Sequence, residues 1–284
     1  MAASTRTSPT VLRWELGARL RSLRTRSGLS IEDAARELMC SQAKVSRMET
    51  AGRGIQPRDV RDLCRLYTVE DTVRDELIRM ANDAKRPGWW QQYGTLDEQA
   101  ATYIGLESAA TAINMLESRV IPGLLQIPEY SRLLLAGIAT PPLEAEEIDD
   151  AVETRQRRRE RIVSGEVEIS VLLDETVLDR AFGDADILSR QLKELAELAT
   201  LPNVSIRLIP LDAGPHPGVH GSFAHLIFRG RELADVIYLE GLWGNTFVER
   251  PSEVERFRQA YKASENQSWQ PERSLQNLLD RCPD

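Results

Sequence analysis

The sequence has little cysteine, few aromatic residues and no long apolar run. Its three cysteines, Cys40, Cys64 and Cys282, lie far apart and form no CxxC pair. This spacing excludes a disulfide framework or a cysteine zinc site and indicates reduced thiols in a cytoplasm. No stretch approaches the ~20 apolar residues that a membrane helix needs, and the first ten residues lack the apolar core of a secretion signal. We therefore expect neither a membrane partner nor export.

Motifs of common enzymes are also absent. The chain contains no GxSxG, no P-loop, no GxGxxG and no HExxH, so no catalytic residue and no cofactor are expected. All three histidines, His216, His220 and His225, fall in one short segment. Their spacing could serve zinc, but a structural turn is the simpler interpretation, and we predict no metal. The adjacent acids Asp174 and Glu175 are interpreted as a helix cap, with an acid pair as the alternative.

Charge is distributed unevenly along the chain. Before Val69 there are 13 Lys or Arg and 7 Asp or Glu, a net of +6, whereas the whole chain carries −8, which leaves −14 for the remainder. A length of 284 residues allows two domains with their own cores. A basic module on an acidic protein is expected when one domain meets phosphate and the other does not.

The first segment is predicted to be helical. Apolar spacing and capping residues predict helices over 11–27, 31–38, 42–49, 57–67 and 70–85. The sequence Arg86-Pro87-Gly88 stops the last of them. We place the domain boundary there, with one domain over 1–87 and the other over 88–284.

Residues 31–49 predict two short amphipathic helices joined by a tight turn. Ser30 and Ser41 stand where each helix needs a cap. Apolar positions such as Ala34, Val45 and Met48 can face one small core. The second helix then turns a polar face outward, which consists of Gln42, Ala43, Lys44, Ser46 and Arg47.

Small, amide and basic side chains on a helix suit the major groove of DNA. Amides pair with adenine edges, and Lys or Arg pairs with guanine edges or phosphates. Arginines outside this helix could supply phosphate contacts: Arg19, Arg21, Arg24, Arg26 and Arg53. The alternative is a helical bundle with a merely solvated polar face, against which the charge asymmetry argues.

The stretch AKVSRME at 43–49 and the loop Gly52-Arg53-Gly54 resemble the helix-turn-helix of the XRE family, the Cro and phage-repressor type. The resemblance covers roughly 14–84. It implies a five-helix DNA-binding domain with recognition-helix positions at Gln42, Ala43, Lys44 and Arg47. Two departures concern the details of docking: Met39 stands where the turn usually has glycine, and Ile31 where the second helix usually has glutamine. Our candidate DNA-binding residues are Ser30, Ser41, Gln42, Ala43, Lys44, Ser46, Arg47 and Arg53.

The second segment is predicted to be an α+β domain with a small mixed sheet. Helices are expected over 103–117, 128–137, 143–163, 175–182, 186–200, 252–264 and 271–281. Strands are expected over 167–173, 204–211, 222–229, 234–240 and 245–249, with a hairpin across Gly230-Arg231. The helix over 143–163 begins acidic and ends basic, which complements a helix dipole; a second nucleic-acid contact is the alternative.

Phrases in this segment resemble the C-terminal domain of WhiJ-like, also antitoxin-like, regulators of high-G+C Gram-positive bacteria. They are YIGLES (103–108), VIPGLLQIPEY (120–130), RQRRRERI (155–162), LLDETVLDR (172–180), LPNVSIRLIP (201–210) and GSFAHLIF (221–228). The resemblance implies no catalytic residues. It implies a small protein partner encoded nearby.

Four aromatic residues are candidate partner contacts, because exposed Trp and Tyr contribute strongly to interfaces. They are Trp89, Trp90, Tyr93 and Trp243. The alternative is that these rings are buried anchors.

Together these features predict a DNA-binding transcriptional regulator of the repressor type. We expect a nucleoid-associated homodimer that binds double-stranded DNA and whose second domain receives a protein partner or a ligand signal. Two other classes remain open. One is an antitoxin-type module with autoregulatory DNA binding, and the other is an enzyme tethered to DNA, for which a concave cluster of His216, His220 and Asp174 would be the sign.

Overall fold

The structure is a computed structural model that describes residues 8–51, 54–93, 96–242 and 244–282. The chain divides into two compact units. The first is Met1–Gln91 together with the short segment Gly230–Leu233, and the second is the rest of the chain. Each unit has its own core, so each is described by itself.

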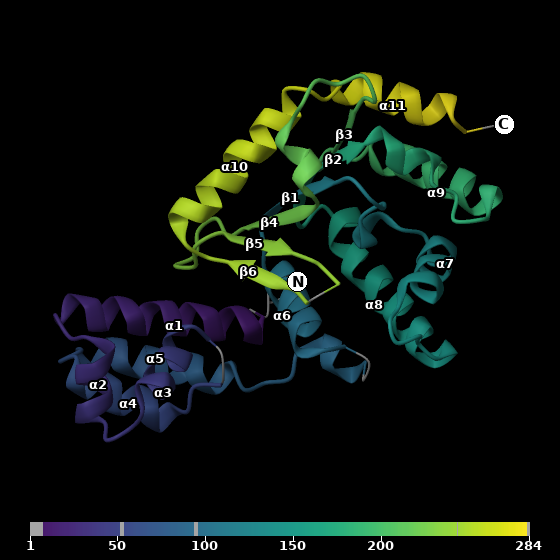
Figure 1. Cartoon of the computed structure of the whole chain (residues 1–284). Helices are drawn as coiled ribbons and strands as arrows, with labels where there is room; N and C mark the ends of the chain where they lie inside the picture. Colours follow the sequence, from purple (N-terminus) through teal and green to yellow (C-terminus); the bar gives the residue numbers. More distant parts are fainter. Residues whose placement is uncertain (1–7, 52–53, 94–95, 243, 283–284) are drawn as a thin grey trace. The chain divides into compact units, whose positions relative to one another are not determined.

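The first unit is built from helices (Figure 1). They are α1 (Pro9–Arg26), α2 (Ile31–Glu37), α3 (Gln42–Glu49), α4 (Pro57–Leu66) and α5 (Asp71–Asp83). Their ends lie close to those expected from the sequence, because caps and prolines mark them. Proline occupies the first turn of α1 and α4, where its missing N–H costs nothing.

The core of the first unit joins all of these helices. Leu16, Val45, Leu63 and Leu77 are fully or almost fully buried, one from each of α1, α3, α4 and α5. Ala34 of α2 completes the cluster. Small residues on α2 allow α3 to pack closely beside it, which is the helix-turn-helix arrangement.

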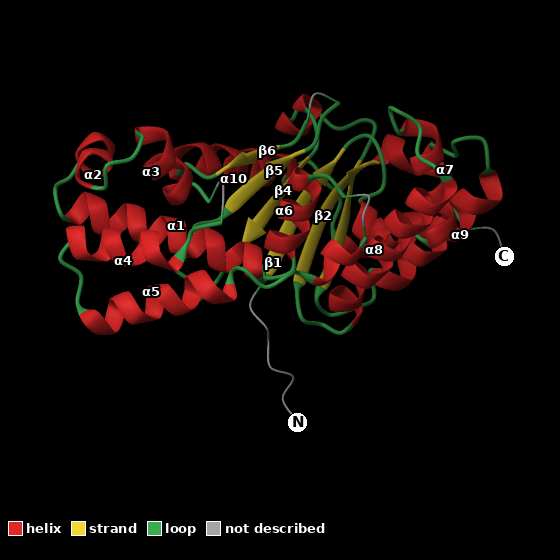
Figure 2. Cartoon of the chain, turned by 90° about the horizontal axis from the view of Figure 1, so that it is seen from below, coloured by secondary structure: helices red, strands yellow, loops and turns green. Residues whose placement is uncertain are grey.

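The second unit mixes helices and strands (Figure 2). Its α-helices are α6 (Glu98–Glu107), α7 (Pro128–Ile138), α8 (Ala145–Val163), α9 (Ala185–Leu198), α10 (Pro251–Glu265) and α11 (Pro271–Asp280). Its strands are β1 (Ala112–Glu117), β2 (Glu168–Asp174), β3 (Val204–Ile209), β4 (Phe223–Ile227), β5 (Val236–Leu239) and β6 (Thr246–Val248). Short 3₁₀ helices are η1 (Trp89–Gln92, across the boundary of the units), η2 (Gly123–Leu125), η3 (Glu175–Asp179) and η4 (Pro217–His220).

The strands form one mixed sheet in the order β3-β2-β1-β4-β5-β6. Pairs β1–β2 and β2–β3 are parallel, and the pairs from β1–β4 to β5–β6 are antiparallel. The expected hairpin between the strands at 222–229 and 234–240 is present as β4 and β5. The α+β class with a mixed sheet is therefore confirmed.

One expected helix is wrong in its second half. We predicted a helix over 103–117, but the helix ends at Glu107 and Ala112–Glu117 is strand β1. This strand pairs with β2 on one side and β4 on the other, so it lies within the sheet. Both of its faces are largely covered, so it lacks the polar alternation that marks a half-exposed strand, and Ala, Met, Leu and Glu favour helix locally. The expected helix at 175–182 is also shorter, as the 3₁₀ helix η3.

Strand β1 divides its side chains between two helical layers. Leu116 packs with Val254 and Tyr261 of α10 on one face. Met115 and Glu117 point to the opposite face, where they line a cavity with residues of α6 and α8. The two-residue period of a strand thus separates an apolar core from a polar cavity.

Candidate functional site

Helix α3 presents a polar face because its apolar residues are buried. Val45 and Met48 are 0% and 6% exposed, whereas Gln42, Ala43 and Arg47 are exposed. Ser41 caps the helix, with its Oγ accepting a hydrogen bond from the backbone N–H of Lys44 at 3.2 Å. The face expected from the sequence is therefore held at the surface by a packed and capped helix.

The carboxyl end of α3 is fixed to α1. Glu49 accepts two hydrogen bonds from Arg24, one from Nε at 2.6 Å and one from Nη2 at 2.9 Å. Arg24 also donates to the backbone oxygen of Leu29 at 2.8 Å. A Cβ at Gly17 would lie 2.9 Å from the backbone oxygens of both Met48 and Glu49, so α1 and α3 meet at a distance that only glycine allows.

Three of the expected DNA-contacting side chains have structural partners, and Ser41, which caps α3, is one of them. Lys44 Nζ lies 2.8 Å from Asp59 Oδ1 of α4. Ser30 caps α2 in a capping box with Asp33, in which each residue accepts from the backbone N–H of the other. Gln42 and Arg47 are therefore the long side chains that α3 presents at the surface.

The arginines suggested as phosphate contacts fall into two groups, those paired with a carboxylate and those exposed. Arg24 is engaged by Glu49, and Arg19 Nη1 lies 2.6 Å from Glu76 Oε1, so neither is a freely exposed cation. Arg21 and Arg26 are exposed. Arg53 lies outside the described residues.

The turn between α2 and α3 is formed without glycine. Met39 takes the left-handed conformation with φ 47°, and its side chain is 93% exposed. A left-handed Met is less favourable than glycine. The turn is therefore kept although Met39 replaces the glycine that usually stands there.

Two of the four candidate contact aromatics, Trp90 and Tyr93, are buried. Trp90 and Tyr93 are 3% and 7% exposed, and the Tyr93 hydroxyl donates to Glu153 Oε1 at 2.9 Å. The expectation of exposed contact rings is therefore wrong for these two, and their burial agrees with the alternative that was left open in the sequence. Trp89 is half-buried, and Trp243 lies outside the described residues.

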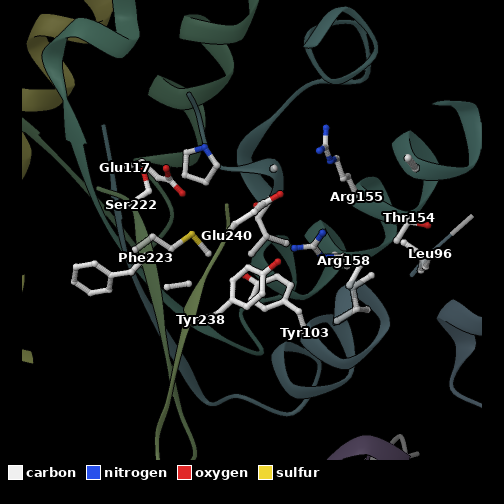
Figure 3. A pocket seen from close by; sticks show the side chains of 18 of the residues that line it. Leu96, Tyr103, Glu117, Thr154, Arg155, Arg158, Ser222, Phe223, Tyr238 and Glu240 are labelled. Carbon is white, nitrogen blue, oxygen red and sulfur yellow. The ribbon is translucent and has the colours of Figure 1, made fainter. Parts of the chain in front are cut away.

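A cavity of about 250 Å³ opens between α6, α8 and the sheet of the second unit (Figure 3). Its charged and polar lining residues are Glu117, Thr154, Arg155, Arg158, Ser222 and Glu240. Tyr103 and Tyr238 form an aromatic wall, with ring centroids 4.0 Å apart and an interplanar angle of 24°. Such a concave site with a few convergent polar groups is typical of small-molecule binding.

The two arginines of the cavity differ in their partners. Arg158 donates to both carboxylate oxygens of Glu107, at 2.8 and 2.6 Å, and its guanidinium lies over the Tyr103 ring. Burial opposes the charge of Arg158, but Glu107 outweighs it and holds the pKa of Arg158 above the ordinary value. Arg155 donates to the neutral amide oxygen of Gln126 at 2.9 Å. Burial, and then the charge of Arg158, lower the pKa of Arg155 to about 10.

Two carboxylates also line the cavity. Burial raises the pKa of Glu117 from 4.5 to about 7, and the negative charge of Glu240 adds to this effect. A hydrogen bond with Ser222 and the charge of Arg119 oppose it. The Ser222 Oγ also accepts from the backbone N–H of Ser118 at 3.3 Å.

His225 and Asp174 have separate partners. His225 is buried in β4, with Nε2 3.0 Å from Asp235 Oδ2. His220 lines a second cavity, of about 630 Å³, that shares Ser222 and Glu240 with the first. Asp174 caps η3, as the capping interpretation predicts. Within the described part of the chain, no three His, Cys, Asp or Glu side chains are grouped to hold a metal ion.

The arginines of α8 are used within the second unit. Arg158, Arg159 and Arg161 have side chains that are 13%, 16% and 23% exposed and pair with Glu107, Glu194 and Glu166. A second nucleic-acid contact on this helix is therefore not supported. The cavity itself was not recognised in the sequence, because its residues come from separate elements and form no motif.

Comparison with protein families places both units. Residues 15–77 match a family model described as a helix-turn-helix domain. Residues 100–280 match one described as a domain of unknown function, DUF5753. No curated protein and no solved structure gives a significant match. No helix among the residues described here is both long and apolar enough to cross a membrane. Because the second match spans more than half of the chain, this protein belongs to the DUF5753 family, and it carries a helix-turn-helix domain of the DNA-binding regulators ahead of that family's domain.

Proposed function

We propose that this protein is a sequence-specific transcriptional regulator that reads the major groove with α3. The observation that carries the proposal is the face of Gln42, Ala43 and Arg47, exposed on a helix that is capped by Ser41 and fixed at Glu49. A rigidly held helix suits base readout, because bidentate contacts require defined geometry. The basic balance of the first 68 residues supplies attraction to phosphate.

The test is a gel-shift titration on an operator found by genome-wide mapping of bound DNA. Gln42→Ala with Arg47→Ala should weaken operator binding and reduce the preference over unrelated DNA, since each lost bidentate contact costs about 1–3 kcal/mol. Arg79→Ala is the matched control, because Arg79 is an exposed arginine on α5, and α5 packs on α1 and α4. Unchanged operator binding by the double variant would exclude α3 as the reading helix.

The proposed regulator acts as a homodimer of the repressor type in the cytoplasm, bound to the nucleoid. A single module buries only about 600–1,000 Å² on DNA, and two-fold dimers reading two half-sites compensate for this. The first unit uses most of its apolar residues in its own core, so the acidic second unit supports the dimer contact. Light scattering should give about twice the 32.0 kDa chain mass, and a value of one chain mass with and without DNA would exclude the dimer.

The second unit is proposed to be a non-catalytic receiver of a protein partner or ligand. Support comes from the separate partners of His225 and Asp174, and from the acidic balance, which would steer a basic partner toward this unit. Co-purification from the native host tests the partner. Recovery with a toxin whose activity the protein blocks would favour the antitoxin-type role, in which DNA binding is autoregulatory.

A further inference from the structure

Several charged side chains of the cavity in the second unit have no ion-pair partner among the described residues. Arg158 is paired with Glu107. Arg155, in contrast, donates to the neutral Gln126, and only the charge of Glu240 favours its charged form, without an ion pair among the described residues. Glu117 and Glu240 repel one another, and the charge of Arg119 partly offsets this at Glu117. Charged groups shielded from water normally have opposite partners, so the half-buried Glu117 and Arg155, with the exposed Glu240 on the same cavity, suit a molecule that brings both signs.

A buried hydroxyl in the same cavity also has no partner. Thr154 is 2% exposed and lines the cavity, yet its Oγ1 makes no hydrogen bond within the described structure. An unsatisfied buried polar group costs free energy, and native proteins retain few of them. Thr154 and Arg155 both line this cavity, so a ligand that occupies it lies within reach of both side chains.

The charges are arranged across the cavity. Figure 3 shows Glu117 and Ser222 at one side, Arg155 at the other, and Glu240 between them. The stacked rings of Tyr103 and Tyr238, with the side chains of Met115 and Leu124, provide an apolar surface in the same space. Gly123 lies against Arg155, where a Cβ would be 3.3 Å from its Nε, so the absence of a side chain keeps this guanidinium accessible.

We propose that this cavity binds a free α-amino acid, with its carboxylate at Arg155 and Thr154 and its ammonium at Glu117 and Glu240. A volume of about 250 Å³ lies below the ~300–1,000 Å³ typical of larger ligands, which favours a molecule of this size. The aromatic and apolar wall then contacts the amino-acid side chain. The proposal concerns the second unit alone, so it is tested without DNA and is independent of the function proposed for α3.

The experiment is calorimetric titration of the full-length, dialysed protein with each of the twenty common L-amino acids. At least one should bind. For that amino acid, the amide, which lacks the carboxylate, and the N-acetyl derivative, which lacks the ammonium, should each bind roughly tenfold to a hundredfold more weakly, as expected for a lost charged hydrogen bond. The proposal would be overturned if none of the twenty amino acids bound. It would also be overturned if the amide and the N-acetyl derivative bound as tightly as the free amino acid.

Variants separate the two ends of the ligand. Arg155→Gln should abolish amino-acid binding. Glu117→Gln should weaken binding of the free amino acid more than binding of its N-acetyl derivative, because the derivative has no ammonium to lose. Thr154→Val preserves shape and should lower affinity several-fold, which keeps the test valid if Arg155→Gln folds poorly. Arg190→Gln is the control, because Arg190 is an exposed arginine of the same unit that pairs with Glu129. Wild-type affinity for the amino acid in Arg155→Gln and Thr154→Val would refute the placement of the carboxylate at these residues. Binding of cadaverine, a diamine without a carboxylate, as tightly as the amino acid would refute it as well.

Discussion

Arg24 of α1 and Glu49 of α3 form a buried, bidentate ion pair, with Nε–Oε1 at 2.6 Å and Nη2–Oε2 at 2.9 Å. Their side chains are 11% and 3% exposed. The hydrogen bond with Glu49 also raises the pKa of Arg24. The pair joins the ends of two helices that are separated in sequence by the whole of α2, and so determines how α3 is held.

Arg24→Ala should destabilise the first unit by about 3 kcal/mol, since it leaves the Glu49 carboxylate buried without a partner. Urea denaturation of the full chain, followed by a signal specific to the first unit, measures the loss. The double variant Arg24→Ala with Glu49→Ala should lose less than the sum of the single variants, because it removes the isolated charge. A loss below about 1 kcal/mol in Arg24→Ala would show that the pair contributes little.

Gly17→Ala should destabilise the first unit by about 1–3 kcal/mol and weaken DNA binding, because the new methyl group would push α3 away from α1. Thermal denaturation and gel shift measure the two effects. Ala18→Ser provides the control at the neighbouring exposed position of α1. Wild-type melting temperature and affinity in Gly17→Ala would show that the two helices have more freedom than their distance indicates.

Asp59→Asn should increase affinity for DNA of any sequence, because it releases the Lys44 ammonium that lies 2.8 Å from Asp59. One added phosphate contact makes the dependence of log K on log salt steeper by about 0.9. Fluorescence anisotropy at several salt concentrations measures the slope. An unchanged slope in Asp59→Asn would mean that Lys44 does not reach the DNA backbone.

Glu117 should make the stability of the second unit depend on pH. Its folded pKa of about 7 lies above the ordinary 4.5, so the folded state binds the extra proton between these values. The contribution of Glu117 to stability is therefore fully present below pH 4.5 and is lost as pH rises to about 7, by on the order of 1–3 kcal/mol. Glu117→Gln should remove this fall and raise the melting temperature at pH 8 more than at pH 5.5.

Differential scanning calorimetry at the two pH values measures this dependence. Glu168→Gln is the matched control, since Glu168 pairs with Arg229 at the surface and both side chains are 61% exposed. An equal effect of pH on wild type and Glu117→Gln would contradict the buried position of this carboxyl.

Much of the helix-turn-helix unit could be predicted from its sequence. Ser30 and Ser41 cap helices through hydrogen bonds to residues three positions later, so local spacing identifies these ends. The burial of Val45 and Met48 and the exposure of Gln42 and Arg47 follow from the helical period. In contrast, the pairing of Lys44 with Asp59 depends on how α4 lies beside α3, which no local pattern contains.

The second unit shows where local patterns are insufficient. Ala112–Glu117 consists largely of residues that favour a helix, yet it is a strand because β2 and β4 pair with it on either side. The sequence likewise allowed Tyr93 to be either exposed or buried. Its hydroxyl donates to Glu153, a residue 60 positions away, so its burial depends on a contact that no local pattern contains.

The sequence by itself determined the charge asymmetry, the caps and apolar spacing of the first unit, and the α+β class of the second, because these depend on residues close together in the chain. Only the tertiary structure decided the cavity and its charge balance. Glu117 is at the end of β1, Arg155 in the middle of α8, and Glu240 directly after β5. The burial of Glu117 and the electrostatic interactions among the three residues arise only once folding has brought these elements together, since such interactions depend on distance in space and on exclusion of water.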